Sequence, residues 1–158
     1  MMLNKAELLR QSRVLDRREM TIWLRNALGK PITAAQFNKI MYDLLPLEQA
    51  YQTEVIDYIK TIPGAFVWKA TAGPYSRQGI PDVCAVIDGH FFGFEIKRPY
   101  IGTATKIQEQ TLRQIKEAGG TAAVISFREQ AKEVIDKWKK TQRPGTHGWT
   151  LISCAMPS

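Results

Sequence analysis

Three charged residues stand at the ends of two predicted neighbouring strands. Asp82 follows the turn formers Gly79 and Pro81, whereas Glu95 and Lys97 close the next predicted strand. Residues two apart in a strand point to the same face, so Glu95 and Lys97 project together. The start of one hairpin strand lies beside the end of its partner, which brings Asp82 close to them. The sequence therefore predicts two carboxylates and an ammonium on one sheet face.

This set of residue types favours metal-assisted hydrolysis of a phosphodiester. Carboxylates at Asp82 and Glu95 suit Mg²⁺ or Mn²⁺, which fill their remaining positions with water and substrate phosphate. The backbone carbonyl of Ile96 is a predicted further ligand, since it is a hard oxygen between two functional side chains. Lys97 would orient the water or neutralise charge on the phosphate. The competing interpretation is a turn cap at Asp82 and a structural ion pair between Glu95 and Lys97.

The elements that would position these residues follow from residue 47 onward. The pattern predicts a helix, three strands, a helix, a strand and a helix, at 47–62, 65–68, 82–87, 91–96, 105–118, 121–127 and up to about 140. Asp88-Gly89 is a strong two-residue hairpin pattern, and a later helix acts as a crossover. We therefore predict an α/β domain with a mixed sheet over residues 47–158, with 149–152 as a further candidate edge strand.

Residues 1–46 are predicted to form a separate helical extension. Apolar residues, Trp23 and Leu28 among them, recur there at helical spacing and need a surface to bury against. The extension is also rich in arginine, at positions 10, 13, 17 and 18. Such a run allows two interpretations, a DNA-facing edge or a solvated helix face, and the pattern does not choose between them.

The bulk composition sets broad limits on function. A chain of 158 residues with 44% hydrophobic and 23% charged residues is typical of a globular domain with a modest appendage. The formal net charge of +7 favours a polyanionic partner. Its two cysteines form no zinc-type cluster, and no phosphate-binding glycine loop follows a strand, so we expect no nucleotide cofactor. Without a membrane-length apolar stretch or a signal-peptide pattern, we expect no membrane association and a bacterial or phage-infected host cytoplasm.

The order of these residues is recognisable when they are taken together. It runs Gly79-Ile80-Pro81-Asp82, a hairpin, Phe94-Glu95-Ile96-Lys97, and then Gln108 ahead of Gly119. This order resembles the VRR-NUC branch of the PD-(D/E)XK nucleases over about residues 48–127, roughly half of the chain. The bare Pro-Asp and Glu-x-Lys pattern has low specificity, and the glycine and the glutamine make it considerably more specific. The resemblance implies a restriction-endonuclease-like core.

The resemblance also implies roles for single residues. Asp82 and Glu95 match the metal-binding acids, and Lys97 matches the catalytic lysine. Glu54, in the helix before the strands, matches an additional acid that would hold metal-bound water or a second ion. Gln108 matches the helix glutamine that supports the site. The alternatives are an exposed helical acid at Glu54 and a solvated glutamine at Gln108.

Four residues close to the acids in the sequence are candidates for contacting the substrate. Each carries a donor that can bind a phosphate oxygen, and each has an ordinary solvated side chain as its alternative. They are Lys69, Ser76, Arg77 and Arg98.

The expected function is that of a Mg²⁺- or Mn²⁺-dependent DNA endonuclease. The resemblance implies a homodimer that acts on duplex or branched DNA such as four-way junctions, since cutting two strands symmetrically needs two sites related by a two-fold axis. The helices of residues 1–46 are then a candidate dimer surface or DNA clamp. The alternatives are a nickase, flap or restriction-type nuclease with the same site, a non-catalytic DNA-binding or regulatory protein that retains the fold, and an α/β interaction protein with a chance motif.

Overall fold

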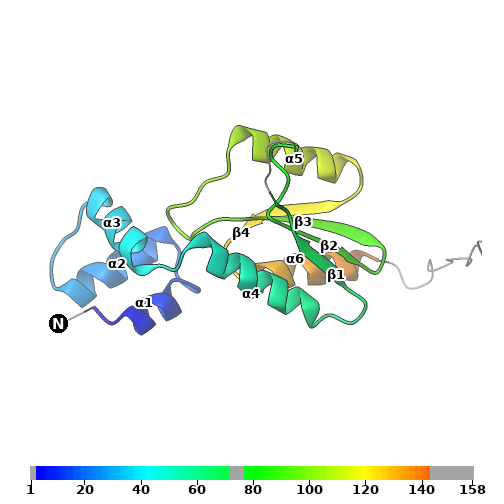
Figure 1. The fold of residues 1–158 in the computed structure, drawn as a ribbon. Helices are drawn as coiled ribbons and strands as arrows, with labels where there is room; N and C mark the ends of the chain where they lie inside the picture. The colour runs from blue at the N-terminus through cyan, green and yellow to red at the C-terminus, as the bar shows by residue number, and fades with distance from the viewer. Residues whose placement is uncertain (1–2, 72–76, 143–158) are drawn as a thin grey trace, which may run out of the picture.

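The computed structural model describes residues 3–71 and 77–142 and shows one mixed sheet covered by helices α4–α6, with helices α1–α3 grouped beside it (Figure 1). The elements, in chain order, are α1 (Lys5–Gln11), α2 (Arg17–Leu28), α3 (Ala34–Leu44), α4 (Glu48–Lys60), β1 (Phe66–Lys69), β2 (Val83–Ile87), β3 (His90–Ile96), α5 (Lys106–Glu117), β4 (Thr121–Ile125) and α6 (Arg128–Thr141). From α4 onward this order confirms the predicted helix, three strands, helix, strand and helix. The candidate strand at 149–152 lies outside the described residues.

The sheet has the order β1-β2-β3-β4 and the predicted mixed character. Strands β1, β2 and β3 are antiparallel neighbours, and β3 and β4 run parallel. Asp88 and Gly89 both have a positive φ, of 51° and 76°, which is the backbone that a two-residue hairpin turn requires. This turn pairs Ile87 with His90 and so sets the register that brings the start of β2 beside the end of β3.

The two faces of the sheet are covered differently. Helices α4 and α6 bury one face, and the core there includes Val55 of α4, Val83 and Phe94 of the sheet and Ile135 of α6. Helix α5 packs on the other face, against β3 and β4 (Figure 1). Because side chains alternate along a strand, Asp82 projects away from the α4–α6 core that holds Val83. The predicted acid site therefore belongs to the face of α5.

The N-terminal helices have a hydrophobic core of their own. Leu8, Met20, Leu24 and Phe37 are at most 1% exposed in it, and Trp23 and Leu28 pack against it half-buried. The apolar residues that need a surface to bury against thus find one within the chain. The apolar residues of these helices therefore do not need a second copy of the chain to bury against.

The segment that follows β3 ties the domain to these N-terminal helices. Arg98 donates from Nη2 to the carbonyls of Tyr42 (2.7 Å) and Leu45 (2.8 Å) at the end of α3. These carbonyls have no partner inside the helix, so the guanidinium completes the helix end. Two residues further on, the Tyr100 hydroxyl donates to the carbonyl of Leu15 (2.6 Å), and Arg17 donates to the carbonyl of Tyr100 (2.7 Å).

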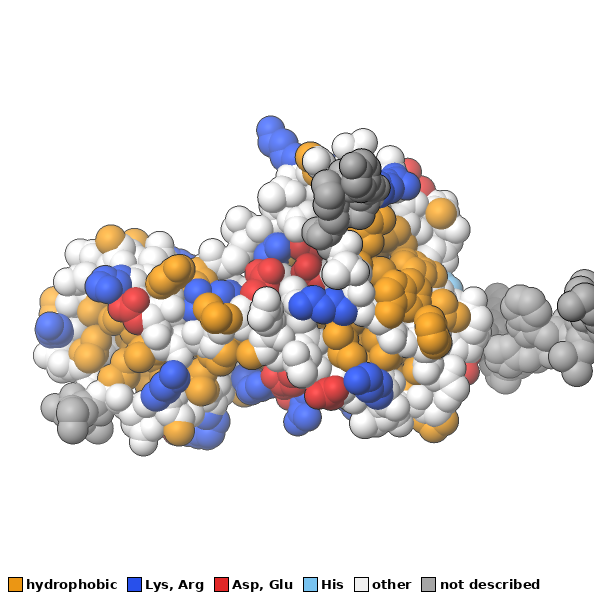
Figure 2. Space-filling model, in the orientation of Figure 1, with side chains coloured by type: hydrophobic (Ala, Val, Ile, Leu, Met, Phe, Trp, Pro, Cys, Tyr) orange, Lys and Arg blue, Asp and Glu red, His pale blue; other side chains and the backbone are white. Residues whose placement is uncertain are grey.

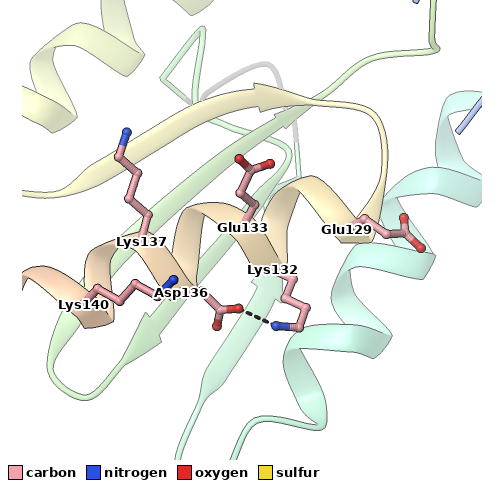
Figure 3. Close-up of a pocket in the computed structure, with 6 residues that line it drawn as sticks. All are labelled: Glu129, Lys132, Glu133, Asp136, Lys137 and Lys140. Atoms are coloured by element: carbon pink, nitrogen blue, oxygen red, sulfur yellow. Dashed lines mark hydrogen bonds and ion pairs between the residues drawn. The ribbon is translucent and has the colours of Figure 1, made fainter. Parts of the chain in front are cut away.

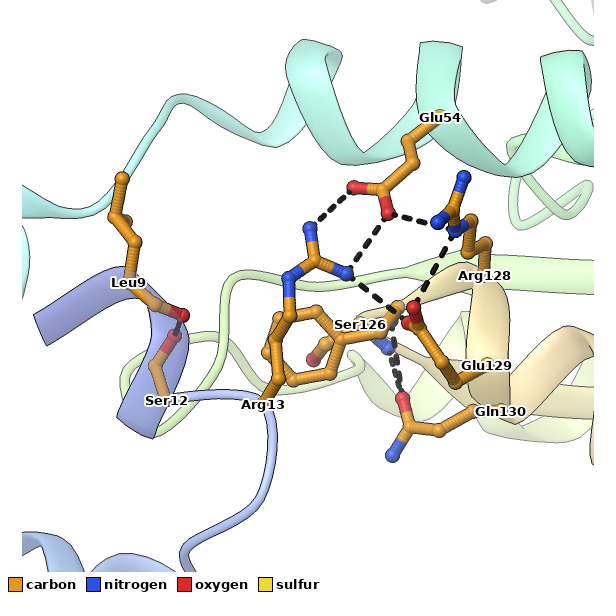
Figure 4. Close-up of polar contacts among 9 residues, drawn as sticks. Leu9, Ser12, Arg13, Glu54, Ser126, Arg128, Glu129 and Gln130 are labelled. Carbon is orange, nitrogen blue, oxygen red and sulfur yellow. Dashed lines mark hydrogen bonds and ion pairs between the residues drawn. The ribbon is translucent and has the colours of Figure 1, made fainter. Parts of the chain in front are cut away.

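A second tie is an ion-pair cluster between Arg13, in the turn after α1, and the helices α4 and α6 (Figure 4). Arg13 donates from both Nη atoms to Glu54 at 2.8 Å and from Nη1 to Glu129 at 3.0 Å. Arg128 lies 3.5 Å from the same Glu54 carboxylate. Arg10 and Arg17 are engaged within the chain too, so the structure uses three of the four N-terminal arginines for its own contacts. These three arginines therefore bind other residues of the chain, which neither a DNA-facing edge nor a solvated helix face had predicted.

None of the helices in the described ranges is long and apolar enough to span a membrane.

The loop that leads to Asp82 leaves no space for a side chain at Gly79. Its φ is +79°, and an added Cβ would lie 2.7 Å from Cγ2 of Ile107 and 2.8 Å from Oγ1 of Thr111. Only glycine combines this backbone with this close approach to α5. Gly79 is thus a contact point between the acid-bearing loop and the helix that covers the site.

Gly79→Ala is expected to lower the free energy of unfolding by about 2–4 kcal/mol, because the left-handed backbone and the overpacking both cost energy. The measurement is urea unfolding followed by circular dichroism. Gly119→Ala is the matched control, since its φ is +90° but nothing lies within 4 Å of the added Cβ. It is expected to cost about 1 kcal/mol, for the backbone alone. Equal losses in the two variants would show that the contact with α5 is unimportant.

Candidate active site

Asp82 is bonded to the end of the neighbouring hairpin strand. Its Oδ2 accepts a hydrogen bond of 2.8 Å from the backbone N–H of Ile96. The backbone carbonyl of Asp82 accepts from the N–H of Ala70 at 2.9 Å, which continues the pairing with β1. The predicted neighbourhood of Asp82 and the end of β3 is therefore confirmed, and one carboxylate oxygen is held in place by the backbone.

Glu95 is a carboxylate with no exposed surface. Its Oε1 accepts from the Lys97 ammonium at 2.7 Å and from the amide Nε2 of Gln108. Its Oε2 is buried and has no hydrogen-bond partner among the described residues. An unpartnered, buried carboxylate oxygen is unfavourable unless it gains a proton or a cation. This oxygen lies on the face that carries Asp82 and Lys97.

The charged groups at this site shift one another's pKa values. Burial raises the pKa of Glu95 to about 7, with a contribution from the nearby Asp82 carboxylate, although the hydrogen bond from Lys97 acts to lower it. Burial acts to lower the pKa of Lys97, but the hydrogen bond and the attraction of Glu95, with Glu48 and Asp82, outweigh it and raise that pKa. Lys97 is therefore a stable cation, and Glu95 is an acid that a further positive charge would keep ionised.

Gln108 is placed by the first turn of α5. The Thr105 hydroxyl accepts from the backbone N–H of Gln108, and the side-chain Oε1 of Gln108 accepts from the N–H of Thr105 at 2.8 Å. This reciprocal capping box uses the amide oxygen, so the amide nitrogen faces Glu95. The predicted supporting glutamine lies at the acids, and the helix cap fixes its orientation.

One residue of α4 lies at the site without having been predicted there. The Oε1 of Glu48 is 4.0 Å from Nζ of Lys97. Helical spacing could have found it, because Glu48 lies seven positions before Val55, an apolar residue that packs in the core.

Glu54 does not lie with the acids, and its predicted placement is corrected. It follows Glu48 by six positions and so points to another side of α4. Its carboxylate is held by Arg13 and Arg128 instead (Figure 4). The acid of α4 that contacts the candidate site is Glu48, through Lys97. Within residues 3–71 and 77–142, no group of three or more His, Cys, Asp and Glu side chains is arranged to hold a metal.

The four predicted substrate contacts have different positions. Lys69 is exposed at the end of β1 and pairs with Val83, so its side chain projects to the face opposite Asp82. Arg77 is exposed and donates to Oε1 of Gln114 on α5 at 2.6 Å. Ser76 lies outside the described residues. For Arg98 the prediction is corrected, because its guanidinium binds the carbonyls at the end of α3 and stacks over the Tyr42 ring.

The donors at the site fit the divalent cation that the sequence suggested. Two carboxylates and the adjacent Ile96 carbonyl are hard oxygens, and Mg²⁺ takes one or two carboxylates and completes its shell with water and phosphate. The orphaned Oε2 of Glu95 is the observation that supports this fit. The cation itself remains a prediction.

A separate surface hollow lies on α6 (Figure 3). Its lining has both signs of charge, namely Glu129, Lys132, Glu133, Asp136, Lys137 and Lys140. Lys132 and Asp136 are paired with each other across one helical turn. The mixture of charges and the exposed position are typical of a solvated helix face.

Comparisons with known proteins give one distant likeness. A solved structure described as a "VRR_NUC domain" is similar to this chain, with 18% identity, a TM-score of 0.49, and coverage of 58% of this chain and 96% of the other. Its description names the same type of domain that the sequence pattern resembles. No family model and no curated protein matches the chain. The proposals below therefore depend on the side chains of this protein and not on that likeness.

Gln108→Glu is expected to keep the helix cap and destabilise the site, because it replaces the donor to Glu95 with a second carboxylate. The loss should be about 1–3 kcal/mol at pH 8 in EDTA, as for a buried acceptor deprived of its partner. The repulsion raises the folded-state pKa of the pair above the unfolded value, so stability falls as pH rises. At pH 6 a shared proton restores a donor, and the loss should shrink.

Urea unfolding at the two pH values measures this difference. Gln110→Glu, an exposed glutamine of the same helix, is the control and should show little effect at either pH. A loss for Gln108→Glu that is the same at pH 6 and pH 8 would contradict the contact with Glu95.

Proposed function

We propose that this protein is a metal-dependent endonuclease that hydrolyses phosphodiester bonds in DNA. The observation that carries the proposal is the convergence of Asp82, Glu95 and Lys97 on one sheet face. Within the part of the chain that the structure describes, the buried Oε2 of Glu95 has no partner. A carboxylate pair beside a raised-pKa lysine is a costly arrangement for a structural role alone, since an apolar cluster would be at least as stable. Perturbed acids and bases that converge in this way are typical of functional sites.

Each side chain has a distinct role in this proposal. Asp82 and Glu95 would hold the cation, with the Ile96 carbonyl beside them. Bound Mg²⁺ or Mn²⁺ would lower the pKa of a coordinated water and neutralise phosphate charge. Lys97 keeps its proton and faces the acids, so it can orient a water or stabilise negative charge that develops on the phosphate. Gln108 holds Glu95 in place, and Glu48 restrains Lys97 from the side of α4.

DNA is the proposed substrate, and branched DNA such as a four-way junction is the preferred form. The net charge of +7 favours a polyanion. Arg77 is exposed in the loop that precedes Asp82 in the chain. We further propose that the protein acts as a homodimer, because two strands that are cut symmetrically need two sites related by a two-fold axis. A nickase or flap nuclease would use the same residues and differ only in the substrate it cuts.

Asp82→Asn and Lys97→Met are each expected to lower the cleavage rate by roughly 10²–10³-fold, because each removes one charge from the site. Asparagine can still accept from the N–H of Ile96, so the hairpin contact is kept. The measurement is cleavage of labelled linear duplex, single strand, flap and four-way junction with Mg²⁺, Mn²⁺ or EDTA.

The same panel tests the finer proposals. Paired, symmetric nicks in the four-way junction would support two linked sites, and scattered single nicks would favour a nickase. If the folded wild-type protein cuts none of the substrates with either metal, the proposal of a nuclease is wrong and a DNA-binding role replaces it.

Glu48→Gln and Glu54→Gln are expected to have different effects, which distinguishes the roles of these two acids of α4. Loss of the Glu48 charge should slow cleavage by about tenfold or more, as for residues that orient a metal-site side chain. Glu54→Gln should leave the rate nearly unchanged and lower the free energy of unfolding by about 1 kcal/mol, since its pair with Arg13 is partly solvent-screened. Rates and urea unfolding are measured for both variants. A larger rate loss at Glu54 than at Glu48 would restore the original assignment.

A further inference from the structure

The sheet face that carries the acids exposes two aromatic side chains at its β1 edge. Phe66 and Trp68 of β1 are 69% and 38% exposed there. Trp68 pairs with Cys84. Cys84 follows Asp82 by two residues, so their side chains project to the same face as Trp68. Figure 2 shows a broad hydrophobic surface over the β1–β2 side of the domain, next to the charged side chains at the centre of the view.

Aromatic rings form this surface. The ring centroids of Phe66 and Trp68 are 5.6 Å apart, and those of Trp68 and Phe91 are 6.3 Å apart. We call these three residues the aromatic patch. Phe66 and Trp68 are exposed and Phe91 is half-buried, and the two ring pairs are tilted by 40° and 55°. Nucleobases stack on exposed aromatic faces whatever their sequence.

The aromatic patch is continuous with the candidate active site. The N–H of Ala70 bonds to the carbonyl of Asp82, and Lys69 pairs with Val83, so this end of β1 lies level with the acid. Trp68 is then roughly 7 Å further along the strand, from two steps of about 3.4 Å.

We propose that the aromatic patch stacks unpaired bases of the DNA substrate beside the bond that is cut. This inference rests on the proposed function and narrows its substrate class to DNA with a single-stranded segment at the cleavage site, such as a flap or an opened junction. A nucleobase suits the position better than a second copy of the chain. A second copy seated on Trp68 would stand next to Asp82, on the side from which DNA must reach it.

The test is the binding of fluorescein-labelled oligothymidylate to the full chain in EDTA, followed by anisotropy. Trp68→Leu keeps an apolar side chain without a ring, and Trp68→Phe keeps a ring. We expect Trp68→Leu to weaken binding by about tenfold, the effect of one lost base stack, and Trp68→Phe to stay within about threefold of the wild type. Ile22→Ala, an exposed apolar residue of α2, is the control and should bind like the wild type.

A strand with abasic sites in place of bases gives an independent readout. It should bind the wild type about tenfold more weakly than the intact strand does, and it should show no further loss with Trp68→Leu. Thermal melting of each variant establishes that it is folded.

Two results would overturn the stacking surface. One is equal affinity of Trp68→Leu and the wild type for oligothymidylate. The other is a Trp68→Leu variant that dissociates from dimer to monomer in light scattering with its affinity per chain unchanged, which would assign the patch to a second copy. Because binding is measured without metal, a protein that stacks DNA on Trp68 but cuts nothing would refute the hydrolysis and leave the stacking surface intact.

Discussion

The carboxylate of Glu95 has no exposed surface, and the positions of the neighbouring side chains compensate for its burial. An ionised group removed from water is unfavourable unless charges and donors replace its hydration. Here the replacement comes from two directions, since Lys97 follows it on the same strand end and Gln108 reaches it from α5. Both bind the same oxygen, Oε1, which leaves Oε2 without a partner among residues 3–71 and 77–142. A purely structural carboxylate would gain from partners on both oxygens, and the proposed cation would supply the missing one.

The rest of the domain supplies the positions that this arrangement requires. The hairpin register places Asp82 where its carboxylate accepts from the N–H of Ile96, between Glu95 and Lys97. The capping box of α5 fixes the Gln108 amide, and Gly79 lets the loop before Asp82 touch that same helix. A shift of α5 would therefore disturb the donor to Glu95 and the approach to Asp82 at once. The site is coupled to the packing of a single helix.

Contacts close in sequence were predictable, and contacts distant in sequence were not. The period of two along β2 and β3 and the Asp-Gly turn are local patterns, so they were enough to bring Asp82, Glu95 and Lys97 together. Glu54 was assigned from the family resemblance, and Glu48 was not considered because the orientation of α4 over the sheet was not used. The pairing of Arg13 with Glu54, 41 positions apart, leaves no periodic trace in a sequence. The contacts of Arg98 with carbonyls of α3, up to 57 positions away, leave no periodic trace either.

Side-chain size divides the face that carries the acids into two parts. Under α5 the sheet presents Gly93, where an added Cβ would lie 2.9 Å from Pro81 and 3.3 Å from Ile115. That absence of a side chain lets the helix approach closely enough for Gln108 to reach Glu95. On the β1 side the same face carries Phe66 and Trp68, whose rings would hold a helix at a greater distance. The close approach that completes the site and the exposure of the neighbouring rings are thus consequences of one pattern of small and large residues, which is why an uncovered aromatic surface lies directly beside the acids.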